Sequence, residues 1–525
     1  MTSPYLIAIL AYLIGLTGLS VFLSRRVKTG ADFMVAGRGL SLPILVGTLF
    51  ATWIGSGTII ASAGLSYRVG ISALWGPSGA WLGIFLLFFI ARRARRLKAF
   101  TIPDLLEARY NPAARLLGTL VTVIAYTVIT SYQFRAGGMV LNLVGGIDPE
   151  VGMAVTAIFV IAFTAFAGMV SVAYTDFVNG VILTVGILVS FPMILADAGG
   201  WEGLTRSLGP EFFAPFHGET EGIGAMNLFL PTLLLLLGES NMYSRFFSAR
   251  DEGVAYRAVI WWIIGVVIIE TCVVLIGTSG RILSPDLAAR YPELANPSEL
   301  IVPHLILTTL HPAIGILLLA ATAAIIVSTA DSFLLTPAVN VQHDLWERFV
   351  RPWLRAPVLK PDNHGSDHSI ETQKSSGNGP PERRMRRLCN FLPESPTDRE
   401  RILFLRVVVI LLGIWAYLQV TFFPNVLQAA LYAYTMYGAS LTPAILAAFT
   451  WKRATPLAGA CSVATGMITT LLWEFALQPR LSGSALGEVD PVIPAVLLSI
   501  LTLVVVSLIS RPPEREKWQP FFDAG

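Results

Sequence analysis

Residues 51–58 read Ala-Thr-Trp-Ile-Gly-Ser-Gly-Thr and lie in the middle of an apolar run from about 43 to 66. Such a run can cross the hydrocarbon core of a bilayer, where the chain must be helical because no water is present to pair with free peptide groups. Glycines and hydroxyl side chains interrupt this run near its centre. The stretch therefore predicts a membrane helix that is broken near the middle of the bilayer.

The rest of the chain is similarly apolar. Of its 525 residues, 54% are hydrophobic and only 14% are charged, whereas soluble domains are about 45–50% apolar and about 25% charged. This composition argues against a water-soluble enzyme and predicts an all-α integral membrane protein. Runs of about 18 or more apolar residues predict about thirteen transmembrane helices, at approximately 5–24, 43–66, 72–91, 116–144, 150–168, 175–196, 226–243, 256–278, 312–335, 402–421, 425–449, 455–476 and 491–510.

The basic residues predict the orientation of the chain, because Lys and Arg are enriched in cytoplasmic loops. With the N-terminus outside and the C-terminus in the cytoplasm, few of the 37 basic residues lie in outer loops. The inner side then holds most of them, including Arg92, Arg93, Arg95, Arg96 and, in one loop, Arg245, Arg250 and Arg257. The net charge of +3 is too small to indicate a nucleic-acid partner. Three widely spaced cysteines indicate neither a disulfide framework nor a zinc site.

Two features organise the chain. Residues 356–400 are polar and rich in Pro, Ser, Gly and charge, which predicts a flexible cytoplasmic loop. After the first helix, the next ten predicted helices form two sets of five, and each set opens with an interrupted helix. The second interruption has Pro231 and then Gly-Glu-Ser-Asn at 238–241. We therefore expect an extra helix and inner loop at 1–42, helix sets at 43–199 and 200–449, and two helices with a tail at 450–525.

Breakers at matching positions of two halves indicate discontinuous helices that hold ions and substrate at the midplane, although Gly and Ser also serve close helix packing. In the predicted ninth helix, residues 328–332 read Ser-Thr-Ala-Asp-Ser. At 100° per residue their oxygens occupy one side of the helix. Hydroxyls in membrane helices often bond to their own backbone, but the added acid, Asp331, favours a site for a desolvated cation. Ionisable residues elsewhere in the spans need a partner or a role. The deep ones are Arg135, Asp176, Glu239 and Glu270, the last without an assigned role, and Glu474 lies nearer an outer end.

Four motifs resemble the sodium:solute symporter family: residues 51–55, 168–176 (Gly-Met-Val-Ser-Val-Ala-Tyr-Thr-Asp), 245–250 (Arg-Phe-Phe-Ser-Ala-Arg) and 328–332. The resemblance implies a leucine-transporter-like fold, in which a five-plus-five inverted repeat with two discontinuous helices works by alternating access on a sodium gradient. It implies a main sodium site at Ala51, Ile54, Ile325, Ser328 and Thr329. Some members have a second sodium site, which would correspond to Asp176, Ser328, Asp331 and Ser332.

The resemblance also implies that the substrate lies beside these ions, against Thr52, Trp53, Ser56, Gln133, Glu239, Asn241 and Tyr434. Trp53 could instead serve packing, and Glu239 is expected either to hold a substrate ammonium group or to pair with Arg135. The strings Ala-Thr-Trp at 51–53, Ser-Val-Ala-Tyr-Thr-Asp at 171–176 and Ser-x-Ala-Asp-Ser at 328–332 are most similar to the branch of the family that contains choline transporters. A quaternary ammonium prefers several aromatic faces, but Met242 and Ala429 stand where other aromatic residues would be expected. Amino acids, other amines and small carboxylates therefore all remain open.

We expect a sodium-coupled secondary symporter that imports a small organic solute, and not an enzyme. Two alternatives remain: a membrane-embedded sensor that binds a solute without moving it, and a symporter that is driven by protons through Asp331. The expected partners are the solute and the lipid bilayer of the cell membrane. The sequence indicates no obligatory protein partner.

Overall fold

The computed structural model describes residues 4–24, 36–97, 99–166, 169–292, 294–355, 397–481, 483–484 and 486–522. Within these ranges every long element is a helix, and ten helices are long and apolar enough to cross a membrane, judged by length and composition. The expected number of thirteen spans stays a prediction. Most of the loop predicted at 356–400 lies outside the described residues, and its last residues begin helix α20 (Asp398–Gln419).

The first predicted interruption is present. Helix α3 (Leu42–Trp53) ends at Ile54, and the chain resumes as the π-helical η2 (Gly57–Ser62) and α4 (Ala63–Val69). Gly70 then has a φ of +68°, a conformation that costs glycine little and other residues much more. The chain turns there into η3 (Gly70–Leu74) and α5 (Trp75–Leu87).

The second predicted interruption is also present. Helix α12 (Gly224–Gly238) is separated from α13 (Ser240–Ser248) by Glu239, whose backbone is extended. All nine residues of α13 are buried. The prediction that Arg245 lies in an inner loop is therefore wrong, because this arginine is part of a fully buried helix.

The other long helices are α1 (Pro4–Ser24), α8 (Pro112–Gly145), α9 (Pro149–Phe166), α10 (Met169–Asp197), α14 (Glu252–Leu283), α17 (Pro312–Asn340), α21 (Val426–Thr450), α22 (Pro456–Leu472) and α23 (Val492–Ile509). The short elements are η1 (Ala36–Arg38), α6 (Ala91–Leu97), α7 (Ile102–Arg109), α11 (Gly200–Ser207), η4 (Pro210–Phe213), η5 (Gly218–Thr220), α15 (Leu287–Arg290), η6 (Pro297–Leu300), α16 (Ile301–Thr308), η7 (Val341–Val350), α18 (Arg351–Arg355), η8 (Val420–Phe422), η9 (Trp473–Leu477), η10 (Gln478–Arg480) and α24 (Arg515–Phe522).

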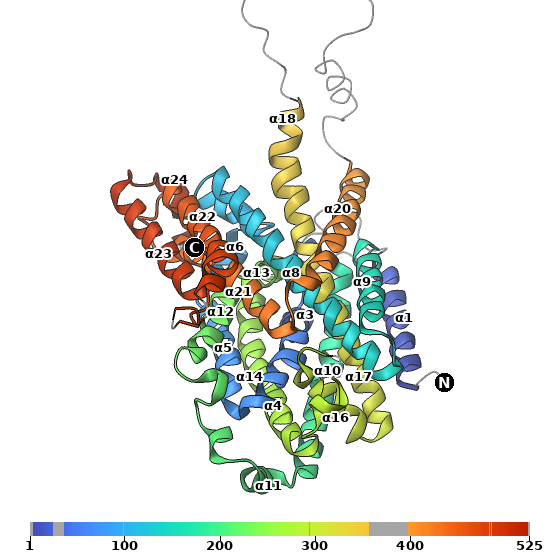
Figure 1. Ribbon diagram of the computed structural model, residues 1–525. Helices are drawn as coiled ribbons and strands as arrows, with labels where there is room; N and C mark the ends of the chain where they lie inside the picture. Colours follow the sequence, from blue (N-terminus) through green and yellow to red (C-terminus); the bar gives the residue numbers. More distant parts are fainter. Residues whose placement is uncertain are drawn as a thin grey trace, which may run out of the picture.

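The two broken helices lie inside the bundle. Helix α3 packs against α10 and α14, α12 packs against α5 and α21, and α17 packs against α8 and α10. Helices α22 and α23 pack on each other at one side, and α1 lies at the other (Figure 1). Large apolar side chains on the outer helices are exposed, as a lipid-facing surface requires, for example Ile158 at 69% and Ile509 at 80%.

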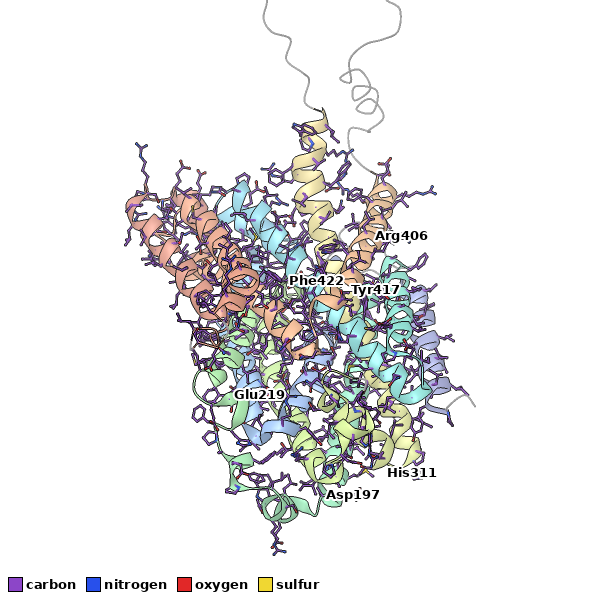
Figure 2. All side chains as sticks on the ribbon, in the orientation of Figure 1. Asp197, Glu219, His311, Arg406, Tyr417 and Phe422 are labelled. Carbon is purple, nitrogen blue, oxygen red and sulfur yellow. The ribbon has the colours of Figure 1, made fainter. Side chains whose placement is uncertain are left out.

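The two ends of the bundle differ in the elements that they carry. Helices α18 and α20 project at one end, and α11 closes the other (Figure 1). Figure 2 shows Asp197 and His311 at the α11 end, whereas Arg406 lies in the half with α18. Helix α24 packs against the arginine-rich α6. The predicted orientation, with the α6 end in the cytoplasm, stays a prediction.

Candidate ion and substrate site

The break after α3 lies directly against α17. At Ile54 the backbone leaves the helix with a ψ of 86°, and the amide of Gly55 donates to the carbonyl of Trp53. The hydroxyl of Thr329 on α17 donates to the carbonyl of Ala51 at 3.2 Å. A methyl group added at Gly55 would lie 2.8 Å from the hydroxyl of Thr329. Only glycine at position 55 allows the segment that follows α3 to approach α17 this closely.

This contact brings together two of the five residues of the predicted main sodium site, Ala51 and Thr329. Ile54 and Ile325 are both buried, Ile54 at the break itself and Ile325 one turn of α17 before Thr329. The hydroxyl of Ser328 has a different partner, since it donates to the carboxylate of Asp176 on α10. Freed carbonyls and hydroxyls of this kind are the hard oxygen ligands that alkali cations prefer.

A buried ion pair holds the centre of the bundle together. The guanidinium of Arg245 on α13 lies 3.1 Å from the carboxylate of Asp176, and their side chains are 1% and 0% exposed. Arg245 also donates to the hydroxyl of Thr48 on α3 at 3.0 Å and to that of Ser332 on α17 at 3.0 Å. The hydroxyl of Thr48 in turn donates to Asp176 at 2.7 Å. One arginine thus connects α3, α10, α13 and α17.

This network involves three of the four residues predicted for a second sodium site. Asp176, Ser328 and Ser332 are joined through hydrogen bonds, but the guanidinium of Arg245 contacts both Asp176 and Ser332. Both carboxylate oxygens of the fourth residue, Asp331, are buried without a hydrogen-bond partner in the part of the chain that the structure describes. A positive charge thus already serves Asp176, and Asp331 is the acid whose oxygens are free.

The break before α13 is organised by its own acid. The carboxylate of Glu239 accepts hydrogen bonds from the amides of Asn241 at 3.1 Å and Met242 at 2.9 Å, and so caps the N-terminus of α13. The hydroxyl of Tyr126 on α8 donates to Glu239 and accepts from the amide of Ser240 at 2.8 Å. Glu239 therefore has a structural role at the helix break.

The alternative pairing of Glu239 with Arg135 is wrong. Arg135 instead donates to the carbonyls of Val420 at 2.6 Å and Phe423 at 2.7 Å, beyond the end of α20. The side-chain oxygen of Asn241 accepts from Thr336 on α17. The side-chain amide nitrogen of Asn241, in contrast, is buried without a hydrogen-bond partner among the described residues.

The remaining substrate candidates lie at the first break. The hydroxyls of Thr52 and Ser56 and both polar atoms of the Gln133 amide are buried without a hydrogen-bond partner among the described residues. The Gln133 amide nitrogen lies near Gly55, where it would be 3.3 Å from an added methyl group. Trp53 stacks on Tyr434 of α21 with ring centroids 6.4 Å apart. Buried polar groups are rarely left unpaired, and each unpaired group needs an explanation.

The sequence did not identify several residues that complete these groups. Thr48, Tyr126 and Arg245 each carry hydrogen bonds that connect different helices, and Trp81 binds Glu270. Arg245 belongs to the motif at 245–250, but its positive charge led to the prediction that it lies in an inner loop. No local signal distinguishes Thr48 or Trp81 from neighbouring residues.

Two interrupted helices, with buried acids and hydroxyls around them in a bundle of apolar helices, define a membrane transporter. The family model of the sodium:solute symporter family matches residues 33–355, which is more than half of the chain. The chain belongs to this family. It is 23% identical over 500 residues to proteins named sodium/proline symporter from Staphylococcus aureus strains JH9 and USA300, and the match covers 92% of this chain and 88% of theirs.

Solved structures confirm the fold class. The chain is similar to the substrate-bound outward-open state of a Na+-coupled sialic acid symporter, with a TM-score of 0.74 and 19% identity over 97% of this chain and 98% of that one. It is also similar to a nucleobase-cation-symport-1 family transporter in a closed conformation, with a TM-score of 0.55 and 12% identity over 93% and 97% of the two chains. The pairing of helices into two inverted sets of five stays a prediction.

These findings confirm sodium-coupled solute symport by a multi-pass membrane protein. Sodium is the coupling ion that the family indicates, and the family consists of transporters and not of enzymes.

Proposed function

We propose that the protein imports a small organic solute and that sodium binds at Ala51, Ile54, Ile325, Ser328 and Thr329. The observation that carries this site is the 3.2 Å contact between the hydroxyl of Thr329 and the carbonyl of Ala51. Two proposed ligands from different helices already meet there, at a break that frees backbone carbonyls. A sodium ion at this place would tie the first broken helix to α17.

The solute site that we propose adjoins this ion at the first break. Its support is the set of buried, unpartnered polar atoms on Thr52, Ser56 and Gln133. A bound solute would supply the missing hydrogen bonds, which an empty apolar pocket could not. The relatives named sodium/proline symporter and the Na+-coupled sialic acid symporter act on small organic solutes, which is the class that we propose here. Glu239 and Asn241 serve this site as supports of the second break.

We propose a second, weaker sodium position beside Asp331, whose free oxygens favour it over Asp176. Asp176 and Ser332 share the guanidinium of Arg245, and a cation at those atoms would be repelled by it. Asp331 is also where a proton would bind in a proton-driven symporter. A sodium ion and a proton at Asp331 are distinguished by whether a sodium gradient or a proton gradient drives uptake.

Uptake into proteoliposomes tests the main site. We expect Thr329→Ala and Ser328→Ala to raise the sodium concentration for half-maximal uptake, because each removes one oxygen ligand. The matched control is Thr122→Ala on α8, which removes an equally buried hydroxyl that donates only to the carbonyl of Gly118. A sodium requirement that is unchanged in both site variants would contradict the assignment, and uptake by the wild type without sodium would contradict sodium coupling.

A further inference from the structure

The sites proposed above leave the buried acid Glu270 without a role. Glu270 lies in the middle of α14, a membrane helix, and only 3% of its surface is exposed. Among the described residues it takes part in no ion pair, although Asp176 and Asp344, two other fully buried acids, each have an arginine. A charge without a counter-charge inside a membrane protein is costly and indicates a function.

The carboxylate of Glu270 is held by neutral donors. The indole N–H of Trp53 on α3 donates to it at 2.9 Å, and that of Trp81 on α5 donates at 2.6 Å. The hydroxyl of Thr58 in η2 lies at 3.5 Å. A carboxylate offers about four lone-pair positions, so at least one is left over. The donors fix the position of the carboxylate but do not neutralise its charge.

Glu270 lines a cavity. The walls include the side chains of Glu270, Trp53, Thr58, Thr232 and Tyr434, and the rest of the lining is mostly apolar. Glu270 is the only charged residue in this lining, and no Lys, Arg or His of the described chain contributes to it. The rings of Trp53 and Tyr434 stack at an angle of 29°, on opposite helices. One negative charge and two aromatic rings therefore face the same space.

These features together select the charge of a ligand. A carboxylate strengthens hydrogen bonds from an ammonium group, and aromatic faces attract cations within about 6 Å of the ring centroid. The same carboxylate repels an anion. We infer that the cavity between Glu270, Trp53 and Tyr434 is the subsite for an ammonium group, so that the transported solute is an amine, a quaternary ammonium compound or an amino acid.

This inference rests on the proposed function, since it names the solute class of the site at the first break. Trp53 belongs both to the cavity and to the broken helix. The cavity measures about 40 Å³, and a water molecule needs about 10–15 Å³ on the same measure. The cavity thus has room for about three water molecules, and a whole solute such as proline enters only when the walls separate at the break beside Trp53.

Ligand-induced thermal stabilisation of the purified protein tests the inference, because a ligand of the folded state raises its apparent stability. The ammonium-bearing probes are L-proline, pyrrolidine, glycine betaine and tetramethylammonium. The probes without ammonium are cyclopentanecarboxylate, which keeps the ring and acid of proline, sialic acid and glucose. We expect stabilisation by at least one ammonium-bearing probe and by none of the others. Binding of cyclopentanecarboxylate or sialic acid, or of no ammonium probe, overturns the inference.

A substitution then tests the residue. We expect Glu270→Gln, which preserves the shape of the side chain, to weaken binding of the ammonium probe about tenfold or more. The matched control is Glu299→Gln, at a buried carboxylate outside the cavity that accepts from the amides of Val426 and Leu427. Both variants are checked for a monodisperse, folded protein. Equal affinity of Glu270→Gln and the wild type for the ammonium probe overturns the assignment. If Glu270→Gln does not fold, the probe series on the wild type alone tests the ammonium subsite.

The failure of the underlying function gives a different result. Stabilisation by an ammonium probe without sodium-driven uptake of that probe would contradict the proposed symport but leave the subsite intact. Sodium-driven uptake of sialic acid or cyclopentanecarboxylate would support symport and overturn the ammonium subsite.

Discussion

Replacement of Arg245 by Met should destabilise the protein strongly. The side chain is 1% exposed and its loss leaves the charge of Asp176 buried with two hydroxyl donors, Thr48 and Ser328, but without a counter-charge. Removal of one partner from a buried ion pair costs about 3–5 kcal/mol. Domains are stable by only about 5–15 kcal/mol, so this single change removes a large part of the total.

A second substitution separates the stranded charge from lost packing. Adding Asp176→Asn to Arg245→Met removes the unpaired charge, and we expect it to restore about 0.5–3 kcal/mol of the loss. The readout is the apparent melting temperature in detergent, with the expected order wild type, double variant, Arg245→Met. The control is Arg250→Met, which breaks an exposed pair with Asp251 and should change little. A double variant less stable than Arg245→Met would refute the reasoning, because the charge would then not be the cause.

Two further predictions concern stability. Burial raises the pKa of Glu107 in α7, but hydrogen bonds from Arg348 and Arg115 outweigh this effect, so the pKa falls below its ordinary value. The stabilisation by these hydrogen bonds is complete above the ordinary pKa and is lost as the pH falls through the lowered value. The difference in melting temperature between the wild type and Glu107→Gln should therefore shrink in acid. A difference that stays constant with pH would contradict a stabilising role of the ionised Glu107. In α21, a methyl group added at Gly438 would lie 2.7 Å from a backbone nitrogen of α12, so Gly438→Ala should lower the melting temperature and Gly18→Ala, in open space on α1, should not.

The helix breaks were predictable because their causes are local. Gly55 and Ser56 in the first break and the polar residues at 238–241 in the second are visible in the sequence and lie where the helices end, whereas Pro231 lies inside α12 and does not interrupt it. The rotation of 100° per residue in a helix also predicted that Ser328 and Thr329 lie on one side of α17. Which residues of other helices face them is not a local property. The contact of Thr329 with Ala51 follows from the packing of α17 on α3.

Charge partners were predicted less well, for the same reason. Glu239 and Arg135 have opposite charges within predicted spans, and an ion pair between them was therefore one of the alternatives that the sequence predicted. The structure pairs each with backbone groups instead: Glu239 caps its own helix α13, and Arg135 reaches carbonyls beyond the end of α20. Both solutions use peptide groups left free where helices end. A list of charged residues does not include such partners.

The position of the first break gives it a particular place in coupling. Ala51, whose carbonyl meets Thr329, and Trp53, whose indole binds Glu270, are two residues apart at the end of α3. The proposed sodium site lies on the α17 side of this short segment and the proposed ammonium subsite on the α14 side. A ligand on either side therefore acts on the same few backbone torsions. Because coupling between two ligands is a difference in affinity for two states of a shared element, and is reciprocal, the end of α3 is the segment where sodium and solute can favour each other without direct contact.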